Sequence, residues 1–271
     1  MIQRHGYIEF LRRNRERSII KVVSGIRRCG KSTLFRLFKD ELLAEGVKPE
    51  QIISINFEEL EYEPLREYHA LYQYILNQMQ PNQMNYIFLD EIQHVDQFHR
   101  VVDSIFVKEN TDIYITGSNA YFMSSDIATL LTGRYVEIQM LPLSFAEFYF
   151  SKYEEQQYSL IPAYEAYLRE SSFPYTQQLG GEDFDIQEYL RGLFNTLLLH
   201  DVVARLKIND VMILQDIVRY IMANVGSLLS PNKIAKSLVS AGRKIDNKTV
   251  ERYLQGLQDL SLIHISEPTR R

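Results

Sequence analysis

Short apolar runs alternate with helix-like apolar patterns through the first half of the chain. Five runs of five or six residues are rich in β-branched and aromatic side chains, as buried strands are, and they lie at 19–24, 52–56, 86–90, 112–116 and 135–139. Between them, apolar residues recur at helical spacing in 31–43, 71–79 and 101–106. Strands separated by helices favour parallel pairing, with helices on both faces of the sheet. The pattern predicts an α/β domain with a parallel sheet over residues 1–150.

The pattern becomes mostly helical after Pro142. Ser144 and Glu147 have the spacing of a capping box, which begins many helices. A looser stretch follows at 171–183, and the pattern changes again near Asn209. We therefore expect boundaries near Phe150 and Asn209, with a helical lid or linker over 151–208 and a further unit over 209–259.

Three helical segments are expected in the C-terminal unit, at 211–224, 231–241 and 247–259. Ser230 is a good N-cap followed by a proline at the first helical position. Gly242 ends the second segment, and Asp246 or Asn247 caps the third. Two short helices joined by a glycine-containing turn are typical of a helix-turn-helix, which this unit is predicted to contain.

Composition and charge limit the class of protein. The chain of 271 residues is 45% hydrophobic and 24% charged, which excludes disordered, collagen-like and low-complexity proteins. A single Cys excludes an internal disulfide and favours a reducing compartment. No apolar run reaches membrane-span length, and residues 1–18 lack the apolar core of a signal peptide. A soluble, cytoplasmic protein without a membrane partner is expected.

The net charge of −5 is unevenly distributed. Residues 205–259 contain nine basic and five acidic side chains, so this stretch is positive although the chain as a whole is negative. A modest basic excess permits nucleic-acid contact without requiring it. If the C-terminal unit binds DNA, Asn247, Lys248 and Arg252 are the expected groove or phosphate contacts. The alternative is that the unit packs as a lid or contacts a protein.

The last twelve residues, 260–271, read like the translated end of a sequencing adapter. We expect them to be non-native and assign His264 and Arg270 no role. The native protein is then expected to continue beyond Leu260.

The first candidate for chemistry is a phosphate loop that follows the first strand and opens the first long helix. It fits G-x-x-x-x-G-K-[ST] and consists of Gly25, Ile26, Arg27, Arg28, Cys29, Gly30, Lys31, Ser32 and Thr33. Glycines let backbone N–H groups close around phosphate oxygens at a helix N-terminus. Lys31 would reach the β- and γ-phosphates, and Ser32 would join the Mg²⁺ shell. A simple strand-to-helix turn is the alternative, and Cys29 is interpreted as a tolerated small residue.

Two adjacent carboxylates, Asp90 and Glu91, end the third predicted strand. Both can approach one site where the chain leaves the sheet. Asp90 would hold Mg²⁺, and Glu91 would orient and deprotonate the attacking water. The alternative is a solvated acidic pair. His94 is interpreted as a surface or packing residue.

Two further polar positions lie near strand ends. Ser118 or Asn119, after the fourth strand, is a candidate to sense the γ-phosphate, with a Gly-containing loop and an Asn helix cap as the alternative. Arg134, before the fifth strand, is a candidate to stabilise transition-state charge, either in cis or from a neighbouring subunit. A structural arginine in a turn is the alternative for Arg134.

These motifs, in this order, resemble those of prokaryotic AAA-type P-loop ATPases related to the archaeal ATPase group. The resemblance covers 19–150 and rests on GIRRCGKST, YIFLDEIQ, ITGSNA and LTGRYVEIQMLPLSFAEF. It implies an extra strand between the phosphate-loop strand and the Mg²⁺ strand, ATP rather than GTP, a winged-helix segment, and a C-terminal nuclease-like domain that this sequence lacks. By position it carries over Gly30, Lys31, Ser32, the Asp90–Glu91 pair and Arg134. One departure is SSFPY at 171–175, where these proteins often have paired glycines.

Three functions are compatible with this pattern. The first is Mg²⁺-dependent ATP hydrolysis coupled to a conformational change of the helical C-terminal part. The second is a nucleotide-gated switch that binds DNA or protein with little turnover. The third, a kinase, is disfavoured because Glu91 directly follows Asp90, which indicates water as the acceptor. The oligomeric state stays open.

Overall fold

The computed structural model describes residues 2, 4–117, 131, 133–153, 158–179, 183–197, 202–208 and 210–259. The chain forms two compact units, Met1–Ile186 (unit 1) and Gln187–Arg271 (unit 2). The predicted boundaries near Phe150 and Asn209 differ from this division. The predicted adapter-derived tail and the candidates Ser118 and Asn119 lie outside the described residues.

Unit 1 contains one parallel sheet with helices on both faces. Its strands are β1 (Ile20–Gly25), β2 (Ile52–Asn56), β3 (Asn85–Asp90), β4 (Thr111–Gly117) and β5 (Tyr135–Met140). Its helices are α1 (His5–Asn14), α2 (Lys31–Ala44), α3 (Tyr68–Gln78), α4 (Phe98–Phe106), α7 (Phe145–Tyr153) and α8 (Leu160–Glu170), and α9 (Asp183–Asn195) leads into unit 2. Short 3-10 helices are η1 (Pro49–Gln51), η2 (Leu60–Arg66), η3 (Ile92–His94) and η4 (Pro174–Gln178). The predicted α/β fold is confirmed, with the predicted strands and helices placed to within three residues.

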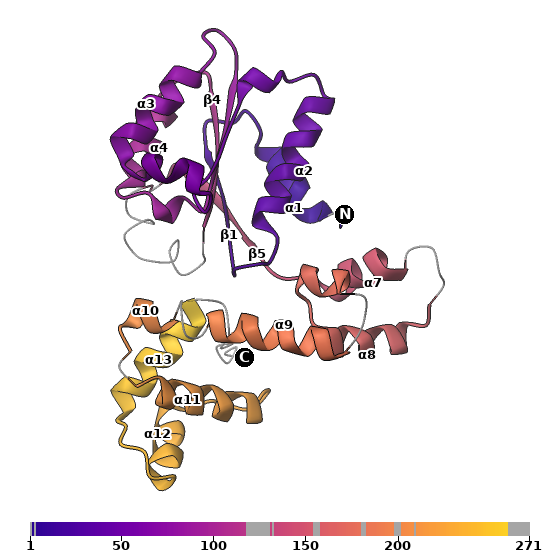
Figure 1. The fold of residues 1–271 in the computed structure, drawn as a ribbon, viewed down its shortest axis with the longest axis vertical. Helices are drawn as coiled ribbons and strands as arrows, with labels where there is room; N and C mark the ends of the chain where they lie inside the picture. The colour runs from indigo at the N-terminus through magenta and orange to yellow at the C-terminus, as the bar shows by residue number, and fades with distance from the viewer. Residues whose placement is uncertain are drawn as a thin grey trace, which may run out of the picture. The chain divides into compact units, whose positions relative to one another are not determined.

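The strand order is β2-β3-β4-β1-β5, and every pairing is parallel. β4 therefore lies between β1 and β3, which confirms the extra strand that the resemblance implied. Figure 1 shows α3 and α4 on one face of the sheet and α1 and α2 on the other. Because the strands are parallel, the residues that follow β1, β3 and β4 emerge at the same edge.

Aromatic packing fixes α2 against the sheet. Phe35 and Phe38 on one face of this helix contact Phe88 of β3 and Tyr114 of β4, with the Phe35 and Phe88 ring centroids 5.2 Å apart. Phe88 and Tyr114 stack on each other at 4.7 Å. The helix that follows the phosphate loop is thus anchored by its second turn, which places its N-terminus over the edge of the sheet.

A buried ion pair lies toward the amino ends of the strands, opposite the edge at which α2 begins. Lys21 of β1 and Asp112 of β4 are both fully buried and bonded to each other. Asp112 also accepts hydrogen bonds from the Tyr114 hydroxyl (2.7 Å) and the Glu16 backbone N–H (2.8 Å). Burial lowers the pKa of Lys21, and the Asp112 carboxylate opposes that effect. The pair ties the α1–β1 connection to the sheet.

Removing one charge of this pair should destabilise unit 1 strongly. We expect Asp112→Asn to lower the free energy of unfolding by about 3 kcal/mol, because it leaves the Lys21 ammonium buried without its counter-ion. Urea denaturation followed by circular dichroism measures this. The control is Glu9→Gln, whose carboxylate pairs with Arg12 at an exposed position (3.6 Å) and should contribute less than about 1 kcal/mol. Equal effects of the two substitutions would contradict the prediction.

The α7–α8 segment belongs to unit 1 because it has its own contacts with the N-terminal residues. Leu143, Phe148 and Ala166 form a small core against which Ile2 packs. The predicted capping box is confirmed, since the Ser144 N–H donates to Glu147 (2.9 Å) and the Glu147 N–H donates to the Ser144 hydroxyl (3.3 Å). These contacts explain why no division of the chain falls at Phe150.

Unit 2 is helical where it is described. It contains α10 (Val203–Leu206), α11 (Val211–Ala223), α12 (Pro231–Ser240) and α13 (Asn247–Asp259), of which the last three match the three predicted segments. Asp246 caps α13 by accepting from the Thr249 N–H at 2.7 Å, whereas Ser230 makes no side-chain capping bond to α12. Gly256 lies against α10, and a Cβ there would be 2.4 Å from Leu206 Cδ1.

The described part of unit 2 contains no strand, so the wing of the predicted winged helix is not confirmed. None of the helices in the described ranges has the length and apolar character needed to cross a membrane.

Candidate active site

The phosphate loop connects the end of β1 to the start of α2. Gly25 is the last residue of β1, and a Cβ there would lie 2.3 Å from the Met140 carbonyl oxygen of β5. Only glycine therefore fits at this position. Gly30 precedes α2 with φ +106°, a left-handed conformation that glycine adopts without strain. The two glycines of the motif are therefore required for local geometry, one by close packing and the other by its backbone angles.

Lys31 is the most buried of the loop's cations. Its ammonium donates a 3.0 Å hydrogen bond to the Gly25 carbonyl and lies 3.0 Å from a carboxylate oxygen of Glu91. Burial acts to lower the pKa of Lys31, but the Glu91 carboxylate outweighs it, and the pKa is raised. Lys31 is therefore a fixed positive charge at the centre of the loop.

Asp90 and Glu91 are brought together with the loop at the carboxyl edge of the sheet. Glu91 follows β3 with φ +55°, and both carboxylates lie against the start of α2, where Asp90 accepts from Ser32 and Glu91 faces Lys31. The Thr116 hydroxyl accepts from the Glu91 N–H (2.9 Å) and donates to Asp90. Burial raises the pKa of Asp90, while hydrogen bonds from Ser32 and Thr116 oppose the rise. Ser32 and Asp90 thus lie in contact, as a shared Mg²⁺ shell requires.

Glu91 is held through both of its carboxylate oxygens. One faces Lys31, and the other accepts a hydrogen bond from the Gln93 side-chain amide. Burial acts to raise the pKa of Glu91, but Lys31 and Gln93 outweigh it and the pKa is lowered. Glu91 is therefore held ionised, which is the state a general base needs.

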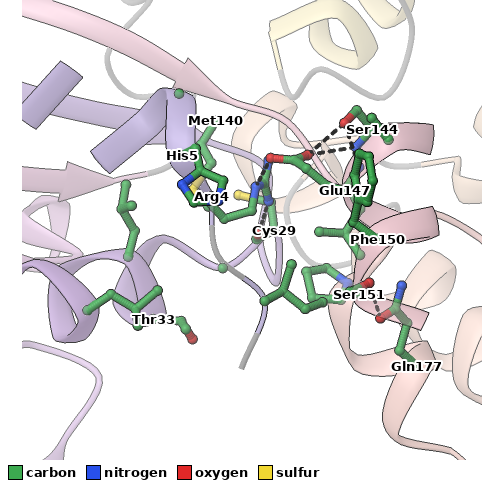
Figure 2. A pocket seen from close by; sticks show the side chains of 18 of the residues that line it. Arg4, His5, Cys29, Thr33, Met140, Ser144, Glu147, Phe150, Ser151 and Gln177 are labelled. Atoms are coloured by element: carbon green, nitrogen blue, oxygen red, sulfur yellow. Dashed lines mark hydrogen bonds and ion pairs between the residues drawn. The ribbon is translucent and has the colours of Figure 1, made fainter. Parts of the chain in front are cut away.

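A cavity of about 980 Å³ adjoins the phosphate loop. Figure 2 shows its walls: Arg4 and His5 from the N-terminal segment, Cys29 and Thr33 from the loop and α2, Met140 from the end of β5, and Ser144, Glu147, Phe150, Ser151 and Gln177 from the segments after it. A second, smaller cavity of about 430 Å³ lies beside Ser32 and Asp90 on the β2 side of α2. The volume of the larger cavity is within the range of small-molecule sites.

Arg134 lies at the wrong edge of the sheet to reach this chain's own phosphate loop. β1 and β5 pair from Ile20 and Tyr135 to Gly25 and Met140, so Arg134 is about 20 Å from the carboxyl edge at 3.3 Å per residue. Its guanidinium instead pairs with Asp103 of α4 (3.1 Å) and lies over the Phe106 ring. The cis alternative is therefore wrong, and any role in hydrolysis would require a second subunit.

The remaining predicted loop residues have different exposures. Ile26 and Cys29 are buried, and burial raises the pKa of the Cys29 thiol, in agreement with its interpretation as a tolerated small residue. Arg27 lies 3.6 Å from Glu58, and Arg28 has φ +64°. Thr33 lines both cavities. Six of the predicted residues meet at the carboxyl edge of the sheet, as the motifs predict: Gly25, Gly30, Lys31, Ser32, Asp90 and Glu91.

Three residues of this region were not selected from the sequence. Thr116 lies near the end of β4, two residues before the candidate Ser118. The only signal for it in the sequence was its position at a polar strand end. Gln93 lies two residues after Glu91, on a 3-10 turn that the motif does not predict. Arg4 belongs to a charged N-terminus without any recognisable motif.

No cluster of three or more metal-ligating His, Cys, Asp or Glu side chains occurs among the described residues. A Mg²⁺ site of the phosphate-loop type does not need one, because this ion is usually held by one or two protein oxygens together with substrate phosphates and water. Ser32 and Asp90 have oxygen atoms of the kind that such a site uses.

Comparisons with known proteins agree with this fold. Residues 17–149 match the AAA domain family, and residues 161–271 match a domain of unknown function. An uncharacterized protein of Haemophilus influenzae is 37% identical over 267 residues, which cover 97% of this chain and 66% of that protein. An uncharacterized protein of Methanocaldococcus jannaschii is 32% identical over 265 residues, covering 91% of this chain and 56% of that protein. The chain thus spans two thirds or less of the length of these relatives.

One solved structure shares the fold over nearly the whole chain. The Walker-type ATPase of Pyrococcus abyssi has a TM-score of 0.65 at 16% identity, with 96% of this chain and 90% of that chain covered.

Proposed function

Because residues 17–149 belong to the AAA domain family, we propose that this protein binds ATP with Mg²⁺ at the phosphate loop and hydrolyses it. The observation that carries the proposal is the meeting of Lys31, Ser32, Asp90 and Glu91 at one edge of the sheet. We further propose that turnover changes the conformation of the helical C-terminal part.

The chain's own groups account for phosphate binding. Backbone N–H groups of 26–32 and the N-terminus of α2 offer positive potential, and the Lys31 ammonium adds a full charge. The large cavity beside the loop would take the nucleoside. Its walls combine apolar groups such as Met140, Leu143 and Phe150 with polar groups such as Gln177.

The hydrolytic step is assigned to Glu91. Phosphate oxygens compete with Glu91 for the Lys31 ammonium, so binding of ATP would release one carboxylate oxygen while Gln93 holds the other. The released oxygen would accept a proton from the attacking water. Mg²⁺ bound through Ser32 and Asp90 would supply charge neutralisation on the phosphates.

Steady-state phosphate release from ATP tests this proposal. Turnover should require Mg²⁺, stop on addition of EDTA, and disappear in Glu91→Gln while ATP binding persists. A folded wild-type protein that binds ATP without releasing phosphate would favour the nucleotide-gated switch instead.

A second candidate function, DNA binding by unit 2, is favoured by the exposed face of α13. Val250, Leu254 and Leu257 are buried in the helical bundle, which leaves the opposite face to solvent. That face carries Lys248 and Arg252, both exposed. A helix packed in this way can enter a major groove or contact phosphates.

Replacing this basic pair should weaken DNA binding. We expect Lys248→Ala/Arg252→Ala to lower duplex affinity about tenfold or more and to reduce the slope of log affinity against log salt by up to about 2. Fluorescence anisotropy at several salt concentrations, with and without ATP, measures this. The charge-matched control Arg13→Ala/Arg17→Ala alters exposed basic residues of unit 1 and should have little effect. Equal affinity of the wild type and the α13 variant would remove this face as the contact.

A further inference from the structure

The N-terminal segment contributes a buried arginine to the nucleotide site. Arg4 immediately precedes α1, is only 4% exposed, and points into the region between the phosphate loop and α7 (Figure 2). Its donors reach three separate parts of the chain. They bond to the Cys29 carbonyl in the loop (3.3 Å), the Leu141 carbonyl after β5 (2.8 Å) and the Glu147 carboxylate of α7 (2.7 Å).

The bond to the Cys29 carbonyl constrains the phosphate loop itself. The peptide between Cys29 and Gly30 is trans, since the described chain has no cis bond. The C=O and N–H of a trans peptide point in opposite directions, so fixing the Cys29 carbonyl also fixes the direction of the Gly30 N–H. Gly30 has a left-handed backbone conformation, and glycine can leave such a conformation easily because it has no side chain. A hydrogen bond from Arg4 to the preceding carbonyl therefore restricts the loop at its most adaptable residue.

The bond to Glu147 fastens the same arginine to α7. Glu147 also accepts from the Ser144 N–H in the capping box, so its carboxylate has a defined position at the start of the helix. The planar guanidinium fork serves the loop carbonyl and this carboxylate at once through two different nitrogens, Nη1 and Nε. Any movement of the loop on nucleotide binding is then transmitted to α7 through one side chain.

We propose that Arg4 is a positioning residue of the nucleotide site, which orients the Gly30 amide through the Cys29 carbonyl and couples the phosphate loop to α7 through Glu147. This inference rests on the proposed ATP binding. It predicts an effect on binding of the β-phosphate, because the loop encloses that group.

The test is calorimetric titration of folded Arg4→Gln with ADP and with AMP. We expect ADP affinity to fall about tenfold, as for loss of a charge-assisted hydrogen bond, and AMP affinity to stay within about twofold. A merely structural role for Arg4 would lower the melting temperature and weaken both nucleotides alike. Arg4→Lys should lose less ADP affinity than Arg4→Gln, because one of the two bonds can still form.

Three controls separate the possible causes. Arg12→Gln removes another N-terminal arginine, one that bonds to Glu41 of α2 away from the loop (2.5 Å), and should leave ADP affinity unchanged. Arg4→Gln/Glu147→Gln removes the carboxylate that Arg4 neutralises and should remain as weak as Arg4→Gln. Glu147→Gln alone keeps the capping box and the loop bond but removes the charge that holds the Arg4 guanidinium, so its loss of ADP affinity should be smaller than that of Arg4→Gln.

Recovery of ADP affinity in the double variant would overturn the proposal, since Arg4 would then act only by neutralising Glu147. Unchanged ADP affinity in Arg4→Gln would also overturn it. If Arg4→Gln does not fold, the same titrations with ADP and AMP are made on Arg4→Lys. A wild-type protein that binds neither ATP nor ADP would refute the proposed function itself.

Discussion

Replacement of Glu91 by Gln is expected to lower the turnover number for ATP hydrolysis by about a hundredfold to ten-thousandfold, the usual contribution of a general base. The amide has the size of the carboxylate and can keep the place between Lys31 and Gln93, but it cannot take a proton from water. Folding should therefore be preserved while the chemical step is lost.

ATP binding by Glu91→Gln should be retained or become tighter. In the wild type the Lys31 ammonium lies 3.0 Å from Glu91, and phosphates must replace that partner. A neutral amide holds the ammonium less strongly, so the lysine is more available to ATP.

Phosphate release and ATP titration of the same preparations measure both parts of this prediction. Glu61→Gln, an exposed glutamate in η2, makes the same charge change away from the site and should behave as the wild type. Turnover by Glu91→Gln within threefold of the wild type would exclude Glu91 as the base.

Replacement of Lys31 by Ala is expected to weaken ATP binding by about a hundredfold or more. The substitution removes the buried charge nearest to the phosphates, in a place where little water screens it. Lys39→Ala is the matched control, because Lys39 lies two turns further along α2 and bonds to Ser54 at 2.8 Å instead of to the loop. Titration calorimetry with ATP compares the two, and similar losses would contradict the prediction.

Lys31→Ala should also change how stability depends on pH. In the wild type the pKa of Glu91 is lowered, so its stabilising contribution is present above its ordinary pKa and is lost as the pH falls. Without Lys31, burial would dominate and raise the pKa of Glu91. The folded variant would then bind more protons than the unfolded chain, and its stability should increase as the pH falls toward 5.

The double variant Lys31→Ala/Glu91→Gln removes this buried, unpaired carboxylate. It should recover stability relative to Lys31→Ala without recovering ATP affinity. Urea denaturation between pH 5 and pH 8 distinguishes the two variants.

The sequence by itself determined the elements and the local chemistry of this protein. Strands and helices have characteristic periods, and the positions of glycine and of capping residues mark their ends, so β2 and α13 were located to the residue. The phosphate-loop spacing likewise determined where Lys31 and Ser32 lie, because both are set by a single strand-to-helix turn. The edge of the sheet at which Asp90 and Glu91 emerge followed from parallel pairing.

Only the tertiary structure decided which distant residues meet. The parallel register of β1 and β5 holds Arg134 at the amino edge of the sheet, away from the phosphate loop, so the sequence could leave a cis role open although the fold excludes it. Arg4 and Glu147 are 143 positions apart and share no motif, yet one side chain connects them to the loop. The same contacts keep α7 within unit 1. Such pairs are not encoded by any local period, because they arise only when separate elements pack on the same sheet and bury their polar groups together.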